Sequence, residues 1–349
     1  MKRVTILGAA LALALGLVAA ASAAAPSDPL YGLQWGPKQI HAEQAWTTST
    51  GAGQVIAVVD SGVDLGHEDL AGKLVPGATF VGCATSCGNG DWRGPDGVAQ
   101  EADTHGTHVA GIAAAATDNG IGIAGVAPDA KVMPVKVLED GSGAFEDIAS
   151  GIRWAADNGA DVINMSLGGT QGLQALVITG LLTDVQDAID YAVSKGVAVV
   201  AAAGNDSVPI CNTPGFDDGV LCVVSTDKRE LRSAFSSGPI RPDLNAVAAP
   251  GGSLLPICGE DIVSTVPAGT SSSGATCGYG NNYDEMAGTS MASPHVAGVA
   301  ALLAAQGRSV QGIYDALTST ARTPGAEARG VFTPVYGYGI VDAAAAVAS

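Results

Sequence analysis

Five apolar runs that show no alternation of polar and apolar residues constrain the fold more than any other feature of the chain. Each run ends in small polar or glycine-rich residues. Strands that are apolar on both sides are typical of a parallel sheet with both faces covered. We expect these strands at 54–60, 131–138, 161–167, 197–204 and 220–225.

Helical candidates lie between these strands. They span 105–117, 144–158, 181–195 and 290–305. Strands that alternate with helices indicate a doubly wound α/β fold, with a mostly parallel sheet and helices on both faces. Hydrophobic residues make up 47% of the 349 residues and charged residues 14%, which suits one large core. We therefore expect a single domain over residues 26–349.

The N-terminal segment has the pattern of a secretory signal peptide. Lys2 and Arg3 precede an apolar stretch at 4–21, and a small-residue triplet occupies 21–23. The alternative is a membrane anchor, but the stretch is rich in alanine and is interrupted by two glycines. We expect a signal peptide over 1–23, with cleavage as late as residue 25, and a secreted protein without membrane contact after its removal.

The chain is strongly acidic, with 34 acidic against 16 basic residues and a formal net charge of −18 at pH 7. A surface of this sign repels nucleic acid and anionic lipid. It attracts cations such as calcium, or it simply keeps an exported protein hydrated. The charge therefore argues against nucleic-acid binding and leaves the two other interpretations open.

The six cysteines fall into three local couples, each within a loop rich in Gly, Ser, Asn or Pro. Proximity and an oxidising compartment favour three short disulfides, although six cysteines permit fifteen pairings. Zinc is the competing interpretation, and only Cys83 and Cys87 come near the ligand spacing that zinc needs. We predict the pairs Cys83 with Cys87, Cys211 with Cys222, and Cys258 with Cys277.

A serine stands at the start of the last predicted helix, in the sequence GTSMASPH at 288–295. Pro294 falls in the first turn of that helix. Unpaired N–H groups and the helix dipole favour negative charge there, and the tetrahedral intermediate of acyl transfer develops such a charge. Ser290 is therefore a candidate nucleophile, although a serine in this place also serves as an ordinary helix cap.

Two histidines lie three residues apart at the start of another predicted helix, in the sequence HGTHVAG at 105–111. No glutamate of an HExxH motif accompanies them, which argues against a catalytic metal. We interpret one histidine as a general base and the other as a residue packed against its helix.

Asp60 and Asn205 each follow an apolar run, at 55–59 and 199–204 respectively. A carboxylate can hold a histidine in one tautomer and stabilise its protonated form. A side-chain amide aimed at a developing oxyanion contributes about 3 kcal/mol. The alternative roles are a strand-end cap for Asp60 and a turn residue for Asn205. Because loops and helix starts meet at the carboxyl ends of parallel strands, we expect both residues near the histidine and the serine.

Five motifs carry a family resemblance. They are VVDSGV at 58–63, HGTH at 105–108, NMSLGG at 164–169, AAAGN at 201–205 and GTSMASPH at 288–295. From about residue 28 to residue 347 the chain resembles the subtilases, most closely their thermitase-like branch. The resemblance implies a serine endopeptidase in which Ser290 attacks the peptide carbonyl, His105 transfers the proton and Asp60 orients His105. Asn205 would share the oxyanion with the backbone N–H of Ser290.

The resemblance also implies a set of substrate-binding residues. Ser166, Leu167 and Gly168 would pair with the backbone of an extended protein or peptide substrate. The pocket for the residue before the cut would be roomy and would prefer large apolar side chains. Its lining residues would be Ala202, Ala203, Gly204 and Gly215.

The resemblance implies no cofactor for catalysis, but it does imply structural calcium. Oxygen ligands from a loop suit that ion. They would be the side chains of Asp28, Asp69 and Asn119, together with carbonyl groups around Ala116, Ile121 and Ile123.

We also expect the protein to be a monomer.

Two features depart from the family pattern. Subtilases usually carry a folding prosegment after the signal, whereas only a short run precedes the core here, so we expect no prosegment domain. The segment between Gly172 and Tyr191 is longer than in the thermitase-like pattern. It borders the strand that would pair with the substrate, so we expect it to alter subsite preference.

Three rival functions can be weighed on the same residues. A GxSxG esterase would have the order serine, acid, histidine, whereas the serine comes last here. The glycine-rich sequence GIGIAG at 120–125 suggests a dinucleotide site, but it follows a helix and precedes a strand, so we interpret it as a loop. The remaining alternative is a catalytically inactive subtilase fold that serves as a binding module, although all four catalytic positions are filled.

Overall fold

The computed structural model describes residues 25–349 apart from 84, 95–100, 171, 179, 181–182 and 327. The predicted signal peptide lies outside the described residues. Among those residues, no helix combines the length and the apolar character that crossing a bilayer requires.

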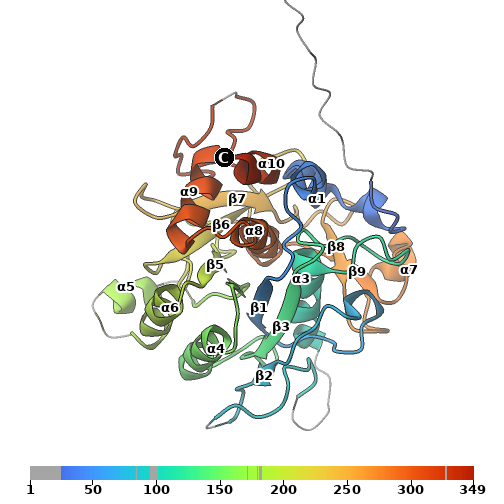
Figure 1. The fold of residues 1–349 in the computed structure, drawn as a ribbon, viewed down its shortest axis with the longest axis horizontal. Helices are drawn as coiled ribbons and strands as arrows, with labels where there is room; N and C mark the ends of the chain where they lie inside the picture. Colours follow the sequence, from blue (N-terminus) through green and yellow to red (C-terminus); the bar gives the residue numbers. More distant parts are fainter. Residues whose placement is uncertain are drawn as a thin grey trace, which may run out of the picture.

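The central element is a parallel sheet of seven strands in the order β2-β3-β1-β4-β5-β6-β7 (Figure 1). All of its neighbouring strands run parallel. This confirms the doubly wound fold and each of the five predicted strands, with ends that shift by a few residues. The strands are β1 (Val55–Asp60), β2 (Ala78–Thr79), β3 (Lys131–Lys136), β4 (Val162–Met165), β5 (Ala198–Ala202), β6 (Val220–Thr226) and β7 (Ala246–Pro250).

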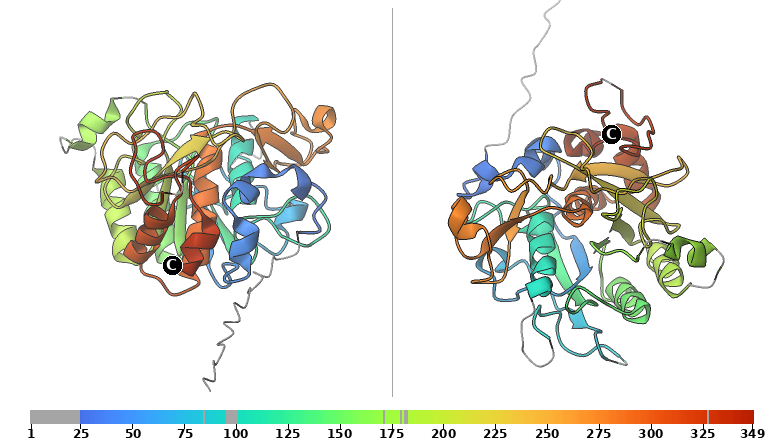
Figure 2. Two further views of the ribbon diagram at one scale, coloured as in Figure 1. Left: turned by 90° about the horizontal axis from the view of Figure 1, so that it is seen from above. Right: turned by 180° about the vertical axis from the view of Figure 1, so that it is seen from behind.

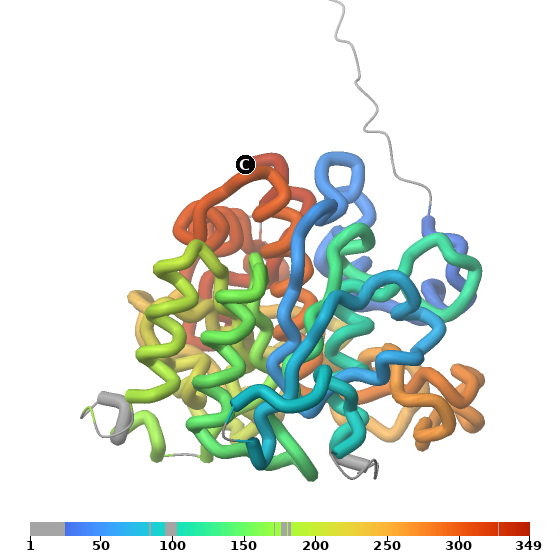
Figure 3. The backbone as a smooth tube through the Cα atoms, turned by 60° about the horizontal axis from the view of Figure 1, so that its bottom comes forward, coloured from blue at the N-terminus to red at the C-terminus, as the bar shows by residue number. Residues whose placement is uncertain are grey.

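Helices cover both faces of this sheet. The principal ones are α3 (His105–Ala114), α4 (Phe145–Asp157), α6 (Asp184–Ser194), α8 (Thr289–Ala304) and α9 (Val310–Thr320). Ile56 and Val58 of β1 join the core beneath α3 and α8, whereas Ala57 and Val59 join the core beneath α4 and α6. Figure 3 shows α4 and α6 side by side on their face. The apolar runs lack alternation because both faces of each strand are buried.

Shorter helices complete the chain. They are α1 (Trp35–Gln39), α2 (Ala42–Trp46), α5 (Leu173–Ile178), α7 (Gly274–Cys277) and α10 (Ala343–Ala348), with the 3₁₀ turns η1 (Tyr31–Leu33), η2 (Glu68–Leu70) and η3 (Glu101–Thr104). The glycine-rich segment 120–125 contains neither helix nor strand and lies between α3 and β3, as predicted.

A two-stranded antiparallel sheet, formed by β8 (Ile262–Thr265) and β9 (Tyr283–Met286), packs against α3. The hydroxyl groups of Ser264 and Thr265 donate to the carbonyl groups of His108 and Thr107, each at 2.7 Å. These bonds fix the side of α3 that faces away from the parallel sheet. The sequence did not predict this small sheet.

Helices α3 and α8 lie against each other near the centre of the molecule (Figure 2). A Cβ atom added at Gly298 of α8 would lie 2.6 Å from the Cβ of Val126 and 3.2 Å from the carbonyl oxygen of Ala113 in α3. Only glycine allows so close an approach at this point. The helix that begins with His105 and the helix that carries Ser290 are therefore held at a fixed separation.

The three predicted disulfides are confirmed. Cys83 pairs with Cys87, Cys211 with Cys222, and Cys258 with Cys277, with Cα–Cα distances of 6.2, 6.8 and 5.5 Å. Because each sulfur is bonded to another sulfur, these cysteines do not form a zinc site.

Candidate active site

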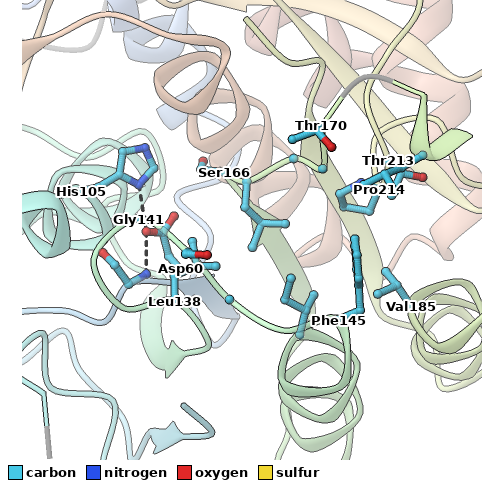
Figure 4. A pocket seen from close by; sticks show the side chains of 18 residues that line it. Asp60, His105, Leu138, Gly141, Phe145, Ser166, Thr170, Val185, Thr213 and Pro214 are labelled. Carbon is cyan, nitrogen blue, oxygen red and sulfur yellow. Dashed lines mark hydrogen bonds and ion pairs between the residues drawn. The ribbon is translucent and has the colours of Figure 1, made fainter. Parts of the chain in front are cut away.

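Asp60 and His105 form a hydrogen-bonded pair at the carboxyl end of the sheet. Asp60 is the last residue of β1 and is fully buried. Its Oδ1 accepts hydrogen bonds from the backbone N–H of Ser61 at 2.7 Å and from His105 Nδ1 at 2.8 Å (Figure 4). A neutral His105 that donates through Nδ1 keeps its Nε2 as a proton acceptor.

The close start of α3 against β1 depends on Gly106. A Cβ atom at this position would lie 2.2 Å from the carbonyl oxygen of Gly62 and 3.2 Å from Asp60 Oδ1. The glycine that follows His105 in the sequence therefore lets the helix begin in contact with the strand-end carboxylate.

The surroundings of His105 keep its imidazole basic. Burial lowers its pKa, but the charge of Asp60 and the hydrogen bond to Asp60 outweigh burial, so the pKa of His105 lies above its ordinary value of 6.5. The side chain remains 28% exposed, so a substrate can reach it. These are the properties of a general base.

His108, one turn along the same helix, has the opposite environment. It is fully buried, and its Nε2 lies 3.0 Å from the carbonyl oxygen of Ile262 and 3.2 Å from that of Asp284. Burial, with a smaller contribution from His105, lowers the pKa of His108 to about 3. Of the two histidines, His105 is thus the candidate base and His108 is a neutral packing residue.

Ser290 lies in the first turn of α8, as predicted. Its hydroxyl donates to the carbonyl oxygen of Ser166 at 3.2 Å, and the Ser166 hydroxyl donates to the carbonyl oxygen of Ser290 at 2.7 Å. The start of α8 is therefore bonded to the segment that follows β4.

Asn205 follows β5 and contacts the residue before Ser290. Its Oδ1 accepts from the backbone N–H of Thr289 at 2.9 Å and from the Thr289 hydroxyl at 3.0 Å. These two bonds orient the amide so that its Nδ2 is the group left to donate outward. Asn205 and Ser290 line the same cavity, of about 260 Å³.

A larger cavity, of about 600 Å³, begins at Asp60 and His105 and extends toward α4 and α6 (Figure 4). The segment 167–170 lines both cavities, so the cavity of His105 and the cavity of Ser290 share a wall. The apolar part of the larger cavity is formed by Leu138, Phe145, Ile148, Leu173, Val185 and Pro214.

The structure brings most of the predicted substrate-binding residues to these cavities. Ser166, Leu167, Gly168, Ala202 and Gly204 line one or both of them. The two others lie behind the cavity walls. Ala203 is fully buried, and a Cβ on Gly215 would lie 2.7 Å from the carbonyl oxygen of Ala202.

Sequence reasoning missed several lining residues. Phe145, Ile148 and Pro214 had no local signal, because only the tertiary fold brings their helix and loop to this surface. Asp206 and Asn212, which line the smaller cavity, were missed as well. Leu173 and Val185 belong to the longer segment between Gly172 and Tyr191, so that segment does border the cavity.

The three side chains predicted as calcium ligands lie together, around the loop that follows α3. Asp28 accepts from the backbone N–H groups of Asp118 and Asn119, at 2.9 and 3.1 Å. Asp69 accepts from the Asn119 side-chain amide and from the N–H of Ile123, each at 2.8 Å. A Cβ on Gly122 would lie 2.2 Å from Asp69 Oδ2, so the loop closes tightly over this carboxylate.

The negative charge of this cluster has no basic side chain beside it in the part of the chain that the structure describes. Asp28 is 3% exposed and Asp69 is fully buried. Among the described residues, neither carboxylate forms an ion pair with a basic side chain. Burial, with a further contribution from the charge of Asp28, raises the pKa of Asp69 to about 6. Two buried carboxylates with an amide side chain beside them fit a hard cation such as calcium.

Comparisons with known proteins agree with this geometry. Residues 51–339 match the model of the subtilase family. The chain is 44% identical to thermitase of Thermoactinomyces vulgaris over 85% of its own length and 91% of thermitase. It is 36% identical to the extracellular basic protease of Dichelobacter nodosus over 93% of this chain, which spans 56% of that protein. A protease structure from Pseudoalteromonas arctica matches with a TM-score of 0.78 and 36% identity, covering 93% of this chain and 99% of the other.

The family match covers far more than half of the chain and includes both the strand that ends in Asp60 and the helix that carries Ser290. The chain therefore belongs to the subtilase family and is a serine-type endopeptidase.

Proposed function

We propose that the protein is a secreted endopeptidase that cleaves peptide bonds through an acyl-enzyme, with Asp60, His105 and Ser290 as its catalytic triad. The observation that carries the proposal is the 2.8 Å hydrogen bond between His105 and a fully buried Asp60, in a cavity that shares the wall 167–170 with the cavity of Ser290. The alternative is an inactive subtilase fold that acts as a binding module.

In the first half of the reaction, Ser290 Oγ attacks the carbonyl carbon of the peptide bond while His105 Nε2 takes the hydroxyl proton. The C–N bond then breaks, and His105 gives the proton to the leaving amine. Asp60 stabilises the protonated imidazole in between. In the second half, His105 takes a proton from water as the water attacks the ester on Ser290. The C–O bond of the ester then breaks, and His105 gives the proton to Ser290 Oγ, which releases the acid and restores the enzyme.

The negative charge of each tetrahedral intermediate needs hydrogen-bond donors. The Asn205 amide, whose oxygen is bonded to Thr289, and the backbone N–H of Ser290 are assigned this role. Donors already in place cost no reorganisation during the reaction, and one such donor contributes about 3 kcal/mol.

The cavities support a broad specificity with a preference for large apolar residues before the cut. Small residues form one wall of the smaller cavity, which leaves room for a large side chain. The segment from Ser166 to Gly168 would pair with the substrate backbone, and the apolar wall around Phe145 would receive a side chain farther from the cut.

Structural calcium is part of the same proposal. The side chains of Asp28, Asp69 and Asn119 would hold the ion together with carbonyl groups around Ala116, Ile121 and Ile123. The ion would supply the positive charge that balances the two buried carboxylates, and it would take no part in the chemistry.

Labelling with a fluorophosphonate tests the proposal against the binding-module alternative. We expect the folded protein to form one adduct, at Ser290, and the Ser290→Ala variant to form none and to lose casein hydrolysis. A folded protein that takes no label and cleaves no casein would instead be a binding module. Cleavage-site profiling on a denatured protein mixture then tests the preference for large apolar residues.

A further inference from the structure

A buried ion pair lies next to the Asp60–His105 pair. Lys136 and Asp103 are both fully buried, with Lys136 Nζ 2.9 Å from Asp103 Oδ2. Lys136 ends β3 and is the register partner of Asp60, which ends β1. Asp103 lies in η3, two residues before His105.

Every hydrogen-bonding group of this pair has a partner. The ammonium group of Lys136 donates to Asp103, to the carbonyl oxygen of Ser61 at 2.8 Å and to that of Trp92 at 3.3 Å. The other oxygen of Asp103 accepts from the backbone N–H of Asp140 at 2.9 Å. Burying two charges is more costly than burying apolar side chains of the same size, so packing alone does not explain this arrangement.

Ser61 connects the ion pair to the catalytic pair. Its carbonyl oxygen accepts from Lys136, and its hydroxyl donates to the carbonyl oxygen of Asp103 at 3.0 Å. The same hydroxyl accepts from the N–H of Gly106 at 3.0 Å, and the N–H of Ser61 donates to Asp60 Oδ1 at 2.7 Å. The two hydroxyl bonds join Ser61, which directly follows β1, to η3 and to the start of α3. Its carbonyl bond joins it to β3, and its N–H bond holds the neighbouring Asp60 carboxylate.

The network also reaches the cavity wall. Asp140 belongs to the turn in which the backbone groups of Glu139 and Ser142 bond each other, and Gly141 and Ser142 line the larger cavity. One buried ion pair thus connects the Asp60 carboxylate, the start of the His105 helix and a turn that faces the substrate.

We propose that Asp103 and Lys136 are positioning residues, which act through Ser61 to hold the Asp60 carboxylate against His105. The proposal rests on the catalytic role proposed for Asp60 and His105. Among the described residues, the charged side chains in this network are Asp60 from β1, Asp103 from η3 and Lys136 from β3, and His108 from α3 interacts electrostatically with His105. Of these, Asp60 is the one that raises the pKa of His105.

The test compares Asp103→Asn and Lys136→Met with the wild-type protein, on active sites counted by fluorophosphonate titration. Per active site, we expect kcat to fall roughly 10- to 100-fold with KM within about twofold, because a misplaced base slows the chemical step. A looser Asp60 contact lowers the pKa of His105, so the acidic limb of kcat/KM moves to lower pH. The downfield proton signal of His105 Nδ1–H should move or broaden.

Ser61→Ala is the second variant, because it removes the hydroxyl bonds and leaves both charges paired, so it can fold even where the charge variants do not. We expect the acidic limb of kcat/KM to move to lower pH and the His105 Nδ1–H signal to move or broaden, as in the charge variants. The loss of kcat should be smaller. Glu230→Gln is the matched control: it breaks the ion pair of Glu230 with Arg322, at 2.7 Å, and lines neither cavity. It should lower the thermal midpoint and leave both kcat and the acidic limb of kcat/KM unchanged.

The outcomes separate this inference from the proposed function. The positioning role alone would be overturned under two conditions. The wild-type protein takes the label and is active, while the Ser61→Ala variant and the folded charge variants keep the wild-type kcat and the wild-type acidic limb of kcat/KM. A wild-type protein that takes no label would overturn the catalytic role on which it rests.

Discussion

Two regions of the molecule bury pairs of carboxylates, and they balance the negative charge differently. In the region of the cavity, Asp60 faces His105 and Asp103 faces Lys136. In the loop region after α3, Asp28 and Asp69 face backbone N–H groups and the amide of Asn119. Among the described residues, no basic side chain pairs with Asp28 or Asp69.

A buried charge must be paired, coordinated to a metal or neutralised by a proton. The cavity region supplies its positive partners from the chain, so its chemistry should need no dissolved cation. The loop region has no such partner among the residues that the structure describes, and it should depend on a dissolved cation. Activity and stability should therefore respond to different changes.

The largest expected effect concerns the cavity region. Ser290→Ala and His105→Ala should each lower kcat on casein by roughly a million-fold, and the double variant should be no worse, because triad members act as a unit. Initial rates measured on freshly purified protein give all three values. Substantial activity in either single variant, or a much lower rate in the double one, would contradict the assignment.

The next effect tests the charge balance itself. Asp60→Asn should lower kcat by about 10⁴-fold, because the amide no longer holds the working tautomer of His105. His105 acts as a base only when neutral, so wild-type activity should fall as the pH drops through a pKa above 6.5. Without the Asp60 charge that pKa decreases, and the acidic limb of kcat/KM should move to lower pH. If the acidic limb of kcat/KM stays at the same pH in Asp60→Asn, then Asp60 does not raise the pKa of the catalytic base.

The smallest effect belongs to the loop region. If calcium binds only the folded protein, removing it with a chelator should lower the thermal midpoint, by an amount equivalent to about 4 kcal/mol when calcium had been present at about 1,000 times its Kd. Asp69→Asn should lose most of this calcium dependence. Asp157→Asn, at a half-exposed carboxylate, should keep it. A midpoint that calorimetry finds insensitive to the chelator would exclude the site.

The sequence predicts the main sheet and the reacting groups because their signals are local. The apolar runs around β1 and β5 identify strands, and Asp60 and Asn205 stand where those strands end. Elements with weak local signals were missed. Strand β7 has the sequence AVAAP, in which alanine and proline give little strand preference, and β8 and β9 have only four residues each.

The groups that support the site could not be predicted in the same way. A lysine inside the apolar run 131–138 signals a buried charge that needs a partner, but Asp103 lies 33 residues earlier in the chain. The cavity wall likewise combines Phe145 of α4 with Val185 of α6. Such contacts depend on how the helices pack over the sheet. The residue pattern within one strand or helix does not determine that packing.

The contact of Gly298 with α3 has a consequence for evolution and engineering. This glycine is buried in α8, where an added methyl group would lie 2.6 Å from the Cβ of Val126, in the segment after α3, and 3.2 Å from the carbonyl oxygen of Ala113 in α3. The helix of Ser290 or its neighbours would have to shift to make room for it. Inherited or engineered variation at this position can therefore silence the enzyme without altering any residue that meets the substrate. A library that varies only the cavity residues and keeps Gly298 would explore new specificities while avoiding this cause of inactivation.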